Sequence, residues 1–102
     1  MKKEVYVTIN HLDECFGYTR FRIGEELILK KDHDNPYDDE AIAVYTKKDY
    51  KCGYVANSVH SVARGTYSAG RIYDQIGENA DCVVRFITED MLIAEIDNKT
   101  KK

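Results

Sequence analysis

The stretch EVYVTIN near the start of the chain alternates between two kinds of position. Val5, Val7 and Ile9 fall on every second residue, and Tyr6 and Thr8 lie between them. A period of two residues places successive side chains on opposite faces of an extended chain, and β-branched and aromatic residues favour strands. The pattern therefore predicts a half-buried β-strand with its aliphatic side chains facing the interior.

The alternation recurs in the stretch EELILKK, which follows the turn residue Gly24. Leu27 and Leu29 share one face and Ile28 lies on the other, as expected for a second strand. Four more short apolar segments are predicted as strands, at residues 41–45, 51–55, 81–88 and 91–96. Five or six short strands joined by polar turns favour a small barrel or sandwich.

The middle of the chain has the spacing of helices instead. In ANSVHSVARGT, Asn57 or Ser58 can cap a helix that ends at Gly65, because apolar residues recur there at i, i+3 and i+4. In SAGRIYDQIG, the first Ser can cap a second helix with the apolar pair Ile72 and Ile76. The expected fold class is thus mainly β with one or two helices (α+β).

Composition and length fit one ordered domain. The 102 residues include 43% hydrophobic and 32% charged residues, which is typical of a globular protein. No repeat or linker interrupts the chain, so we expect a single domain over residues 1–96 and a disordered basic tail over 97–102. The formal net charge of −3 argues against a strongly basic nucleic-acid attractor but leaves room for a local basic patch.

The three cysteines, Cys15, Cys52 and Cys82, lie far apart, and their spacing indicates neither a zinc framework nor a disulfide scaffold. A reducing compartment fits this pattern. No apolar run approaches the ~18 residues that span a bilayer, and the charged opening MKKEVYVTINH lacks a signal-peptide core. We therefore expect a soluble cytoplasmic protein without a membrane partner.

The stretch DHDNPYDDEAIAVY holds five carboxylates and the chain's only Pro. A calcium loop of the EF-hand kind that began at Asp32 would need Gly at its sixth position and Glu at its twelfth. Those positions hold Tyr37 and Ala43, so the spacing does not predict a metal site. Catalysis would need a nucleophile with a base or an opposed carboxylate pair, and the sequence offers neither recognisably. We expect no enzyme activity, no metal and no cofactor.

A mechanical interpretation explains most residue types of this stretch. Asp34 and Asn35 can accept hydrogen bonds from nearby backbone N–H groups, Pro36 presets φ for a turn, and Asp38 or Asp39 can receive later N–H groups. Turn formation does not explain Tyr37, because a turn does not require a tyrosine at this position. Its ring can either cover the end of the fold or face a ligand.

The sequence LILKKDHDNPYDDEAIAVY followed by KCGYVANS resembles the signature of HIRAN domains. The pattern is a strand, a loop with Asn35, Tyr37 and Asp38, a strand that starts with Ala-Ile, and a Gly-aromatic-Val element. GYVANSVHSVARGTYSAGRIYDQIG and VVRFITEDMLIAEI resemble small stand-alone bacterial members. The likeness runs from about Tyr6 to Ile96 and implies an OB-like barrel with flanking helices.

For function, the resemblance implies a module that binds single-stranded DNA at a free 3′ end, in a DNA repair or processing context. It assigns contacts to Asn35, Tyr37 and Asp38 and to an earlier aromatic, which falls on Phe16. Tyr54 follows Gly53 and is the next candidate contact. The run GTYSAGRIYD adds Arg71, a cation near a possible helix start that can approach phosphate.

The chain departs from the DNA-binding pattern at several positions. Asp34 replaces an Asn, Cys15 replaces one ring of an aromatic pair, Tyr54 replaces a His, and Asn57 stands near a basic position. These changes weaken the positive field, and they leave two alternatives open. One is a protein-interaction or regulatory domain that kept the fold without DNA binding, and the other is a nuclease that uses the acidic loop with a divalent metal.

Overall fold

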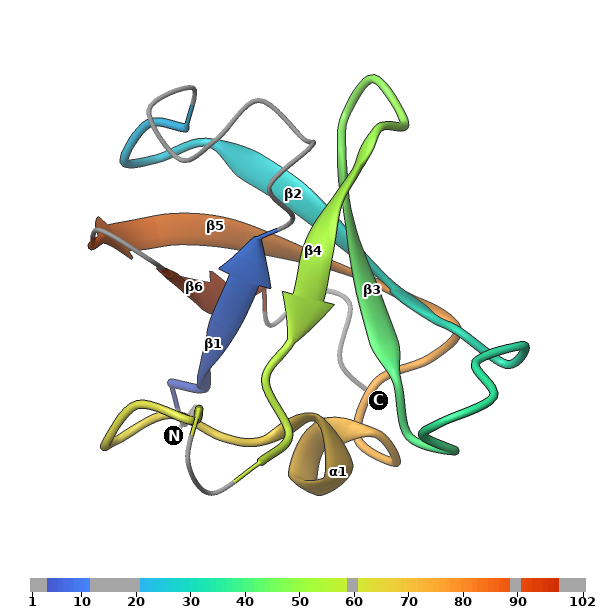
Figure 1. The fold of residues 1–102 in the computed structure, drawn as a ribbon. Helices are drawn as coiled ribbons and strands as arrows, with labels where there is room; N and C mark the ends of the chain where they lie inside the picture. The colour runs from blue at the N-terminus through green and yellow to red at the C-terminus, as the bar shows by residue number, and fades with distance from the viewer. Residues whose placement is uncertain (1–3, 12–20, 59–60, 89–90, 98–102) are drawn as a thin grey trace.

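The computed structural model describes residues 4–11, 21–58, 61–88 and 91–97. Six strands in these ranges form a closed barrel (Figure 1): β1 (Tyr6–His11), β2 (Glu26–Lys31), β3 (Ile42–Thr46), β4 (Lys51–Val55), β5 (Asn79–Ile87) and β6 (Leu92–Ile96). Their order around the barrel is β1-β4-β3-β2-β5-β6, and every neighbouring pair is antiparallel. The predicted mainly β barrel is confirmed.

The alternation of side chains along each strand determines which residues form the core. Leu29 of β2 pairs with Val44 of β3 and with Ala80 of β5, and all three side chains are buried. Val5, Val7 and Ile9 are buried as predicted, and so are Leu27 and Leu29, whereas Ile28 is half-buried on the outer face. One continuous cluster therefore fills the barrel, as expected when each strand turns every second residue inward.

Thr8 differs from the expectation, because it is fully buried although it lies on the outer face of β1. Its Oγ1 accepts a hydrogen bond from the N–H of Ala63 at 3.0 Å and lies 2.8 Å from the Oγ1 of Thr66. The segment that holds Ala63 and Thr66 therefore covers this part of the barrel wall. A buried hydroxyl is tolerated here because it is hydrogen-bonded.

This contact also explains why the first predicted helix is wrong in its described part. Residues 61–66 form turns, and Val59 and His60 lie outside the described residues. The N–H of Ala63, which a helix would direct to a carbonyl four residues earlier, donates to Thr8 instead. The buried hydroxyl of Thr8 on β1 therefore accepts a hydrogen bond from a backbone N–H that the local sequence predicts to be part of a helix.

The second predicted helix is present but shorter. Helix α1 (Ala69–Ile72) has Ser68 as its N-cap, as predicted, and the Ser68 Oγ accepts from the N–H of Arg71. Ala69 and Ile72 are fully buried in the core cluster, and Ile76 joins them after the helix has ended. Helix α1 therefore closes one end of the barrel (Figure 1).

Two connections lie at opposite ends of β3 (Figure 1). The β2–β3 loop, residues 32–41, precedes β3 at the end near α1, and the β3–β4 turn, residues 47–50, follows it. Asp97, the first residue of the expected tail, donates its N–H to the carbonyl of Asp81, and residues 98–102 lie outside the described ranges. In those ranges, no helix combines the length and apolar character needed to cross a membrane.

Candidate functional site

The β2–β3 loop is held by its own side chains. The Oδ1 of Asn35 accepts from the N–H groups of Tyr37 at 2.9 Å and of Asp38 at 3.1 Å. The Oδ1 of Asp38 accepts from the N–H of Glu40 at 2.9 Å. These bonds are the side-chain-to-backbone turns that Asn and Asp form in tight loops. The predicted mechanical role of Asn35 and Asp38 is confirmed.

Tyr37 stands out from this fixed loop with 94% of its surface exposed. The sequence left two alternatives for its ring, cover of the end of the fold and presentation to a ligand, and the exposed ring does not cover the barrel end. Pro36 restricts the backbone before it, and the hydrogen bond to Asn35 holds its N–H. An exposed aromatic ring on a restrained backbone loses less conformational freedom on stacking than one on a mobile loop.

Asp38 is joined to helix α1 through Asn57. The Nδ2 of Asn57 donates to the Oδ2 of Asp38 at 3.1 Å, and its Oδ1 accepts from the N–H of Gly70 at 2.8 Å. A Cβ on Gly70 would come within 2.6 Å of the Glu40 carboxylate and 3.2 Å of the Asn57 amide oxygen. Gly70 therefore allows the loop, the end of β4 and α1 to approach closely.

Tyr54 is joined to the base of the same loop. Its hydroxyl donates to the Oδ2 of Asp32 at 2.8 Å, and this hydrogen bond lowers the pKa of the Asp32 carboxyl below its ordinary value. The ammonium of Lys51 lies 4.6 Å from the centroid of the Tyr54 ring. Hydrogen bonding to Tyr54 raises the pKa of Lys51, so the ammonium form is favoured.

Arg71 lies on α1, one residue from Gly70, and its guanidinium carbon is 4.7 Å from the centroid of the Tyr67 ring. The N–H of Tyr67 donates to the carbonyl of Tyr6 on β1, so the backbone that carries the Tyr67 ring is held against β1. A shallow hollow of about 310 Å³ lies here, lined by Asn57, Val62, Thr66, Ser68 and Arg71. In the part of the chain that the structure describes, Arg71 makes no ion pair.

The structure thus brings together five of the six residues singled out in the sequence. Asn35, Tyr37 and Asp38 share one loop, and Tyr54 is hydrogen-bonded to Asp32 of that loop. Arg71 follows Gly70, whose N–H donates to the Asn57 side chain that is bonded to Asp38. Phe16 and Cys15 lie outside the described residues, so their predicted roles stay predictions. Asp34 is exposed within the loop, where it adds negative charge.

Sequence reasoning missed three functions of residues in this region. Asn57 was expected to cap a helix of its own, Asp32 was considered only as a metal ligand, and Lys51 was not considered. Asn57 and Asp32 act through partners that are distant in sequence, at 19 residues for the Asn57 contact with Asp38 and 22 for the Tyr54 contact with Asp32, and Lys51 enters the region through Tyr54. A local pattern carries no signal for such pairs.

The charge around the loop is mixed. Carboxylates of Asp34, Asp39 and Glu40 are exposed, and His33 contacts Glu78 at 2.6 Å at its outer side. Lys51 and Arg71 supply positive charge on either side. Among the described residues, no three His, Cys, Asp or Glu side chains are grouped so that they could hold a metal ion.

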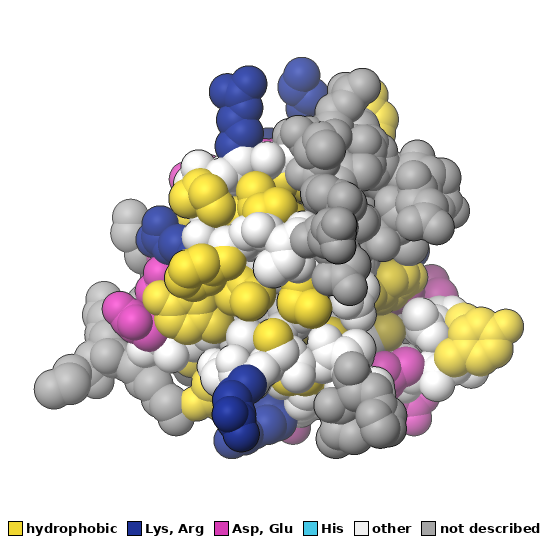
Figure 2. Space-filling model, turned by 60° about the vertical axis from the view of Figure 1, so that its left-hand side comes forward, with side chains coloured by type: hydrophobic (Ala, Val, Ile, Leu, Met, Phe, Trp, Pro, Cys, Tyr) yellow, Lys and Arg dark blue, Asp and Glu magenta, His cyan; other side chains and the backbone are white. Residues whose placement is uncertain are grey.

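Two other surface features lie apart from this loop. A hollow of about 690 Å³ lies at the other end of the barrel, against Phe21 and Tyr50, and an ion pair of 3.3 Å joins Lys47 and Glu26 on its lining. Figure 2 shows a face on which apolar side chains gather in the middle, with basic side chains above and below.

Comparison with known proteins gives one family and one fold relative. The family model described as HIRAN domain matches residues 5–85. A crystal structure of a protein from Lactobacillus plantarum is similar with a TM-score of 0.52 and 20% sequence identity, covering 94% of this chain and 98% of that chain. At this identity the likeness concerns the fold alone. A search of curated proteins found no match.

Proposed function

Because the chain belongs to the HIRAN domain family, a family of DNA-binding domains, we propose that it is a non-catalytic module that binds single-stranded DNA at a free 3′ end. The coarser property, nucleic-acid binding, fits the family. The finer property, recognition of the end of a strand, is supported by the chemistry of the β2–β3 loop. A DNA repair or processing context would follow from such a preference.

The observation that carries the proposal is the exposure of the Tyr37 ring on a fixed loop. A ring stacks on any base face, and removal of such a contact costs about 1–3 kcal/mol per base. Apart from Pro36, the loop residues next to Tyr37 are polar, and the exposed ring is not packed against the core, so packing does not account for a Tyr at this position. Tyr37 is therefore the proposed stacking platform for the terminal base.

Asp38 is the proposed acceptor for the terminal 3′ hydroxyl. Its two oxygens each hold one hydrogen bond within the protein, from Glu40 and from Asn57, whereas a carboxylate offers about four acceptor positions. A hydroxyl can donate to the remaining positions. A phosphate group at the same place would meet a half-buried negative charge, which disfavours a continuing or phosphorylated strand.

The remaining residues are proposed as follows. We propose that Asn35 stabilises the loop conformation and that Tyr54 lies at the edge of the binding site. We propose that Arg71, whose guanidinium lies over the Tyr67 ring, contacts the phosphate that precedes the terminal nucleotide. A guanidinium presents several N–H donors in one plane, which suits phosphate oxygens. Phe16 is proposed as a second ring on the basis of the family pattern alone.

Fluorescence anisotropy at low salt tests the proposal with matched oligonucleotides that end in a 3′ hydroxyl or a 3′ phosphate. We expect tighter binding of the hydroxyl form, and Tyr37→Ala should weaken it by about 5- to 150-fold, which corresponds to the loss of one stacked base. Tyr50→Ala removes another exposed Tyr at the far end of β3 and should leave binding unchanged.

Asp38→Asn removes the charge and keeps the size of the side chain, but its amide nitrogen cannot accept one of the two hydrogen bonds from Glu40 and Asn57, so Asn57→Ala, which breaks the loop contact and keeps the charge, is its control. In Asp38→Asn, the preference for the hydroxyl form should shrink mainly through improved binding of the 3′ phosphate form. No binding of any oligonucleotide at low salt by the wild-type protein would contradict the proposal.

A protein partner is the second candidate, and the acidic surroundings of Tyr37 favour it. Asp34, Asp39 and Glu40 are exposed near the ring, and together they form a surface that attracts basic side chains. If oligonucleotides do not bind while a basic peptide binds in a manner that depends on Tyr37, this second function replaces the first.

A further inference from the structure

Two tyrosine rings on the outer wall of the barrel each have a lysine ammonium over them. They lie on the strands that adjoin the β2–β3 loop, not in the loop itself. The ammonium of Lys30 on β2 lies 4.5 Å from the centroid of the Tyr45 ring on β3, and that of Lys51 on β4 lies 4.6 Å from the centroid of the Tyr54 ring. We call Lys30, Tyr45, Lys51 and Tyr54 the ring–lysine ladder.

The strand register makes the ladder one surface. Tyr45 pairs directly with Lys51, while Lys30 and Tyr54 both pair with Ala43, which lies between them on β3. These side chains face outward, because the intervening residues Leu29 and Val44 point into the core. Three neighbouring strands thus alternate rings and cations across the wall.

One end of the ladder meets the proposed 3′-end site. The Tyr54 hydroxyl donates to Asp32, the first residue of the β2–β3 loop, and the N–H of Asp32 donates to the carbonyl of Ala41 at the far side of that loop. The ladder therefore starts at the base of the loop that presents Tyr37. From there it continues along β3 and β4 toward the β3–β4 turn.

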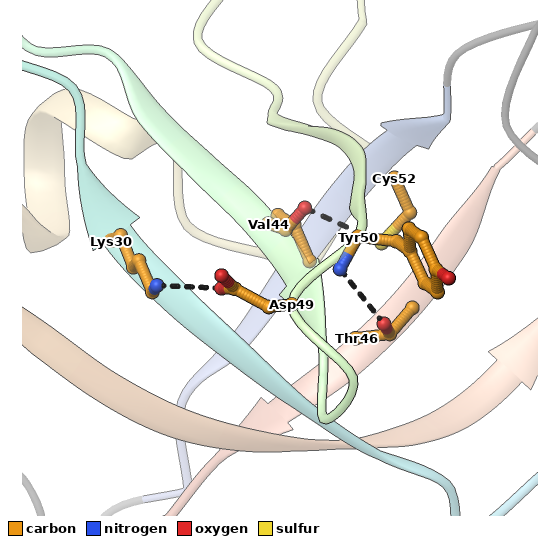
Figure 3. A network of polar contacts seen from close by, with 6 residues as sticks. All are labelled: Lys30, Val44, Thr46, Asp49, Tyr50 and Cys52. Atoms are coloured by element: carbon orange, nitrogen blue, oxygen red, sulfur yellow. Dashed lines mark hydrogen bonds and ion pairs between the residues drawn. The ribbon is translucent and has the colours of Figure 1, made fainter.

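The two lysines differ in how much of their charge is already neutralised. Lys30 makes an ion pair of 3.0 Å with Asp49 of the β3–β4 turn, which Figure 3 shows reaching back toward β2. Lys51 makes no ion pair with any described residue, and the carboxylate that acts on its charge is that of Asp32. Lys51 is therefore the cation of the ladder that is more available to an anionic ligand.

Rings covered by lysines suit one kind of occupant. A lysine on the outer face of a ring shows that this face is not packed against the core, so a base can take its place and the ammonium can move to the adjoining phosphate. A nucleic-acid strand offers both flat bases for rings and phosphates for cations, and the two ring–lysine pairs here offer the matching groups. A protein segment has no such regular alternation of flat rings and negative charges.

We propose that the ring–lysine ladder binds the body of a single nucleic-acid strand, the nucleotides on the 5′ side of the terminal one. This inference rests on the proposed function, since the 3′ end is placed at the β2–β3 loop and the strand then extends along β4 and β3. Bases stack on Tyr54 and Tyr45, and Lys51 contacts phosphate, with Lys30 contributing less because of Asp49.

The test is fluorescence anisotropy with 3′-hydroxyl oligothymidylates whose lengths run from two nucleotides to about ten. Affinity of the wild-type protein should rise with length beyond the dinucleotide. Lys51→Gln should flatten that rise and make the slope of log K against log salt shallower by about 0.7, the value for one phosphate contact on a single strand. Lys48→Gln makes the same charge change on the β3–β4 turn and should alter neither.

Two further variants separate stacking from charge. Tyr45→Leu should flatten the rise with length, while Tyr45→Phe keeps the ring and should preserve it. Asp49→Asn should steepen the rise, because it releases Lys30 from its ion pair; Asn also tolerates the positive φ of 73° at this position.

The possible outcomes distinguish this inference from the function on which it rests. If Lys51→Gln and Lys48→Gln behave alike, or if polyglutamate competes as well as an oligothymidylate of equal charge, the ladder inference is wrong. Tyr37→Ala should weaken binding at every length and leave the gain per added nucleotide in place. If Tyr37→Ala and the 3′ phosphate have no effect while the ladder variants do, the proposed 3′-end site is wrong and the strand is bound without an end.

Discussion

The amide of Asn57 donates to the carboxylate of Asp38 across 3.1 Å and at the same time accepts the N–H of Gly70. One side chain after β4 thereby holds the β2–β3 loop against the first turn of α1. The three residues come from three separate segments of the chain. This contact sets the position of the loop that presents Tyr37.

Replacement of Asn57 tests this link. Asn57→Ala leaves the N–H of Gly70 and one oxygen of Asp38 without their protein partner, so we expect a loss of about 1–3 kcal/mol in the free energy of unfolding. Urea denaturation measures the loss, and hydrogen exchange at the Gly70 amide should become faster. Asn10→Ala changes an exposed Asn on β1 and should cost much less. Equal stability of the two variants would contradict the link.

The loop itself should depend on Asn35. Asn35→Ala removes the acceptor for the N–H groups of Tyr37 and Asp38, so the backbone of Tyr37 should become more mobile on the nanosecond timescale. The measurement is the ¹⁵N order parameter of Tyr37. Asn35→Asp keeps a side-chain oxygen for both donors and serves as the control. An unchanged order parameter in Asn35→Ala would show that the loop is held by other contacts.

Stability should depend on pH through Asp32. The hydrogen bond from Tyr54 lowers the folded-state pKa of Asp32, so this contribution is present above the unfolded value of about 3.9 and is lost as pH falls through the lower folded pKa. Tyr54→Phe should raise the Asp32 pKa and destabilise the protein at neutral pH. The difference from wild type should narrow in strong acid.

Carboxyl titration by NMR and denaturation at neutral and acidic pH check both parts. Tyr45→Phe removes a hydroxyl on the neighbouring strand β3 and should leave the titration of Asp32 unchanged. If the difference between wild type and Tyr54→Phe were the same at both pH values, the hydrogen bond would not act through the Asp32 charge.

The core cysteines should be unreactive in the folded protein. Burial raises the pKa of the Cys82 thiol far above its ordinary value, and Cys52 is fully buried as well. Since the thiolate is the reactive form, alkylation by iodoacetamide at mildly alkaline pH should require unfolding. Peptide mass spectrometry should show labelling of both residues rising with the unfolded fraction in urea. Rapid labelling without denaturant would contradict the packing of the barrel.

The strands could be predicted from the sequence because side chains in a barrel wall alternate between interior and exterior with a period of two residues. The alternation of Leu27, Ile28 and Leu29 predicts which side chains are buried, and the structure agrees. The helix expected around Ala63 was wrong because the buried Thr8 hydroxyl, 55 residues away, takes the N–H of Ala63. A hydrogen bond between distant segments leaves no trace in the local pattern.

The candidate site was likewise predictable only where its contacts join residues that are close in sequence. The turn made by Asn35 and Asp38 was predictable, because both side chains bond to backbone groups within three residues. The exposure of Tyr37 was one of two open alternatives, and the bonds that bring Asn57 and Asp32 to the site were not predictable. The ring–lysine ladder also depends on the pairing of three strands, which a single-sequence reading does not specify.

Chemical-shift mapping tests the central claim most directly. A short oligonucleotide with a 3′ hydroxyl is titrated into ¹⁵N-labelled protein, and the amide shifts are followed by residue. The account predicts the largest changes at Asn35, Tyr37 and Asp38, with further changes at Gly70 and Arg71. Shifts confined to the far end of the barrel, around Phe21, Lys47 and Tyr50, or no shifts at any concentration, would contradict it.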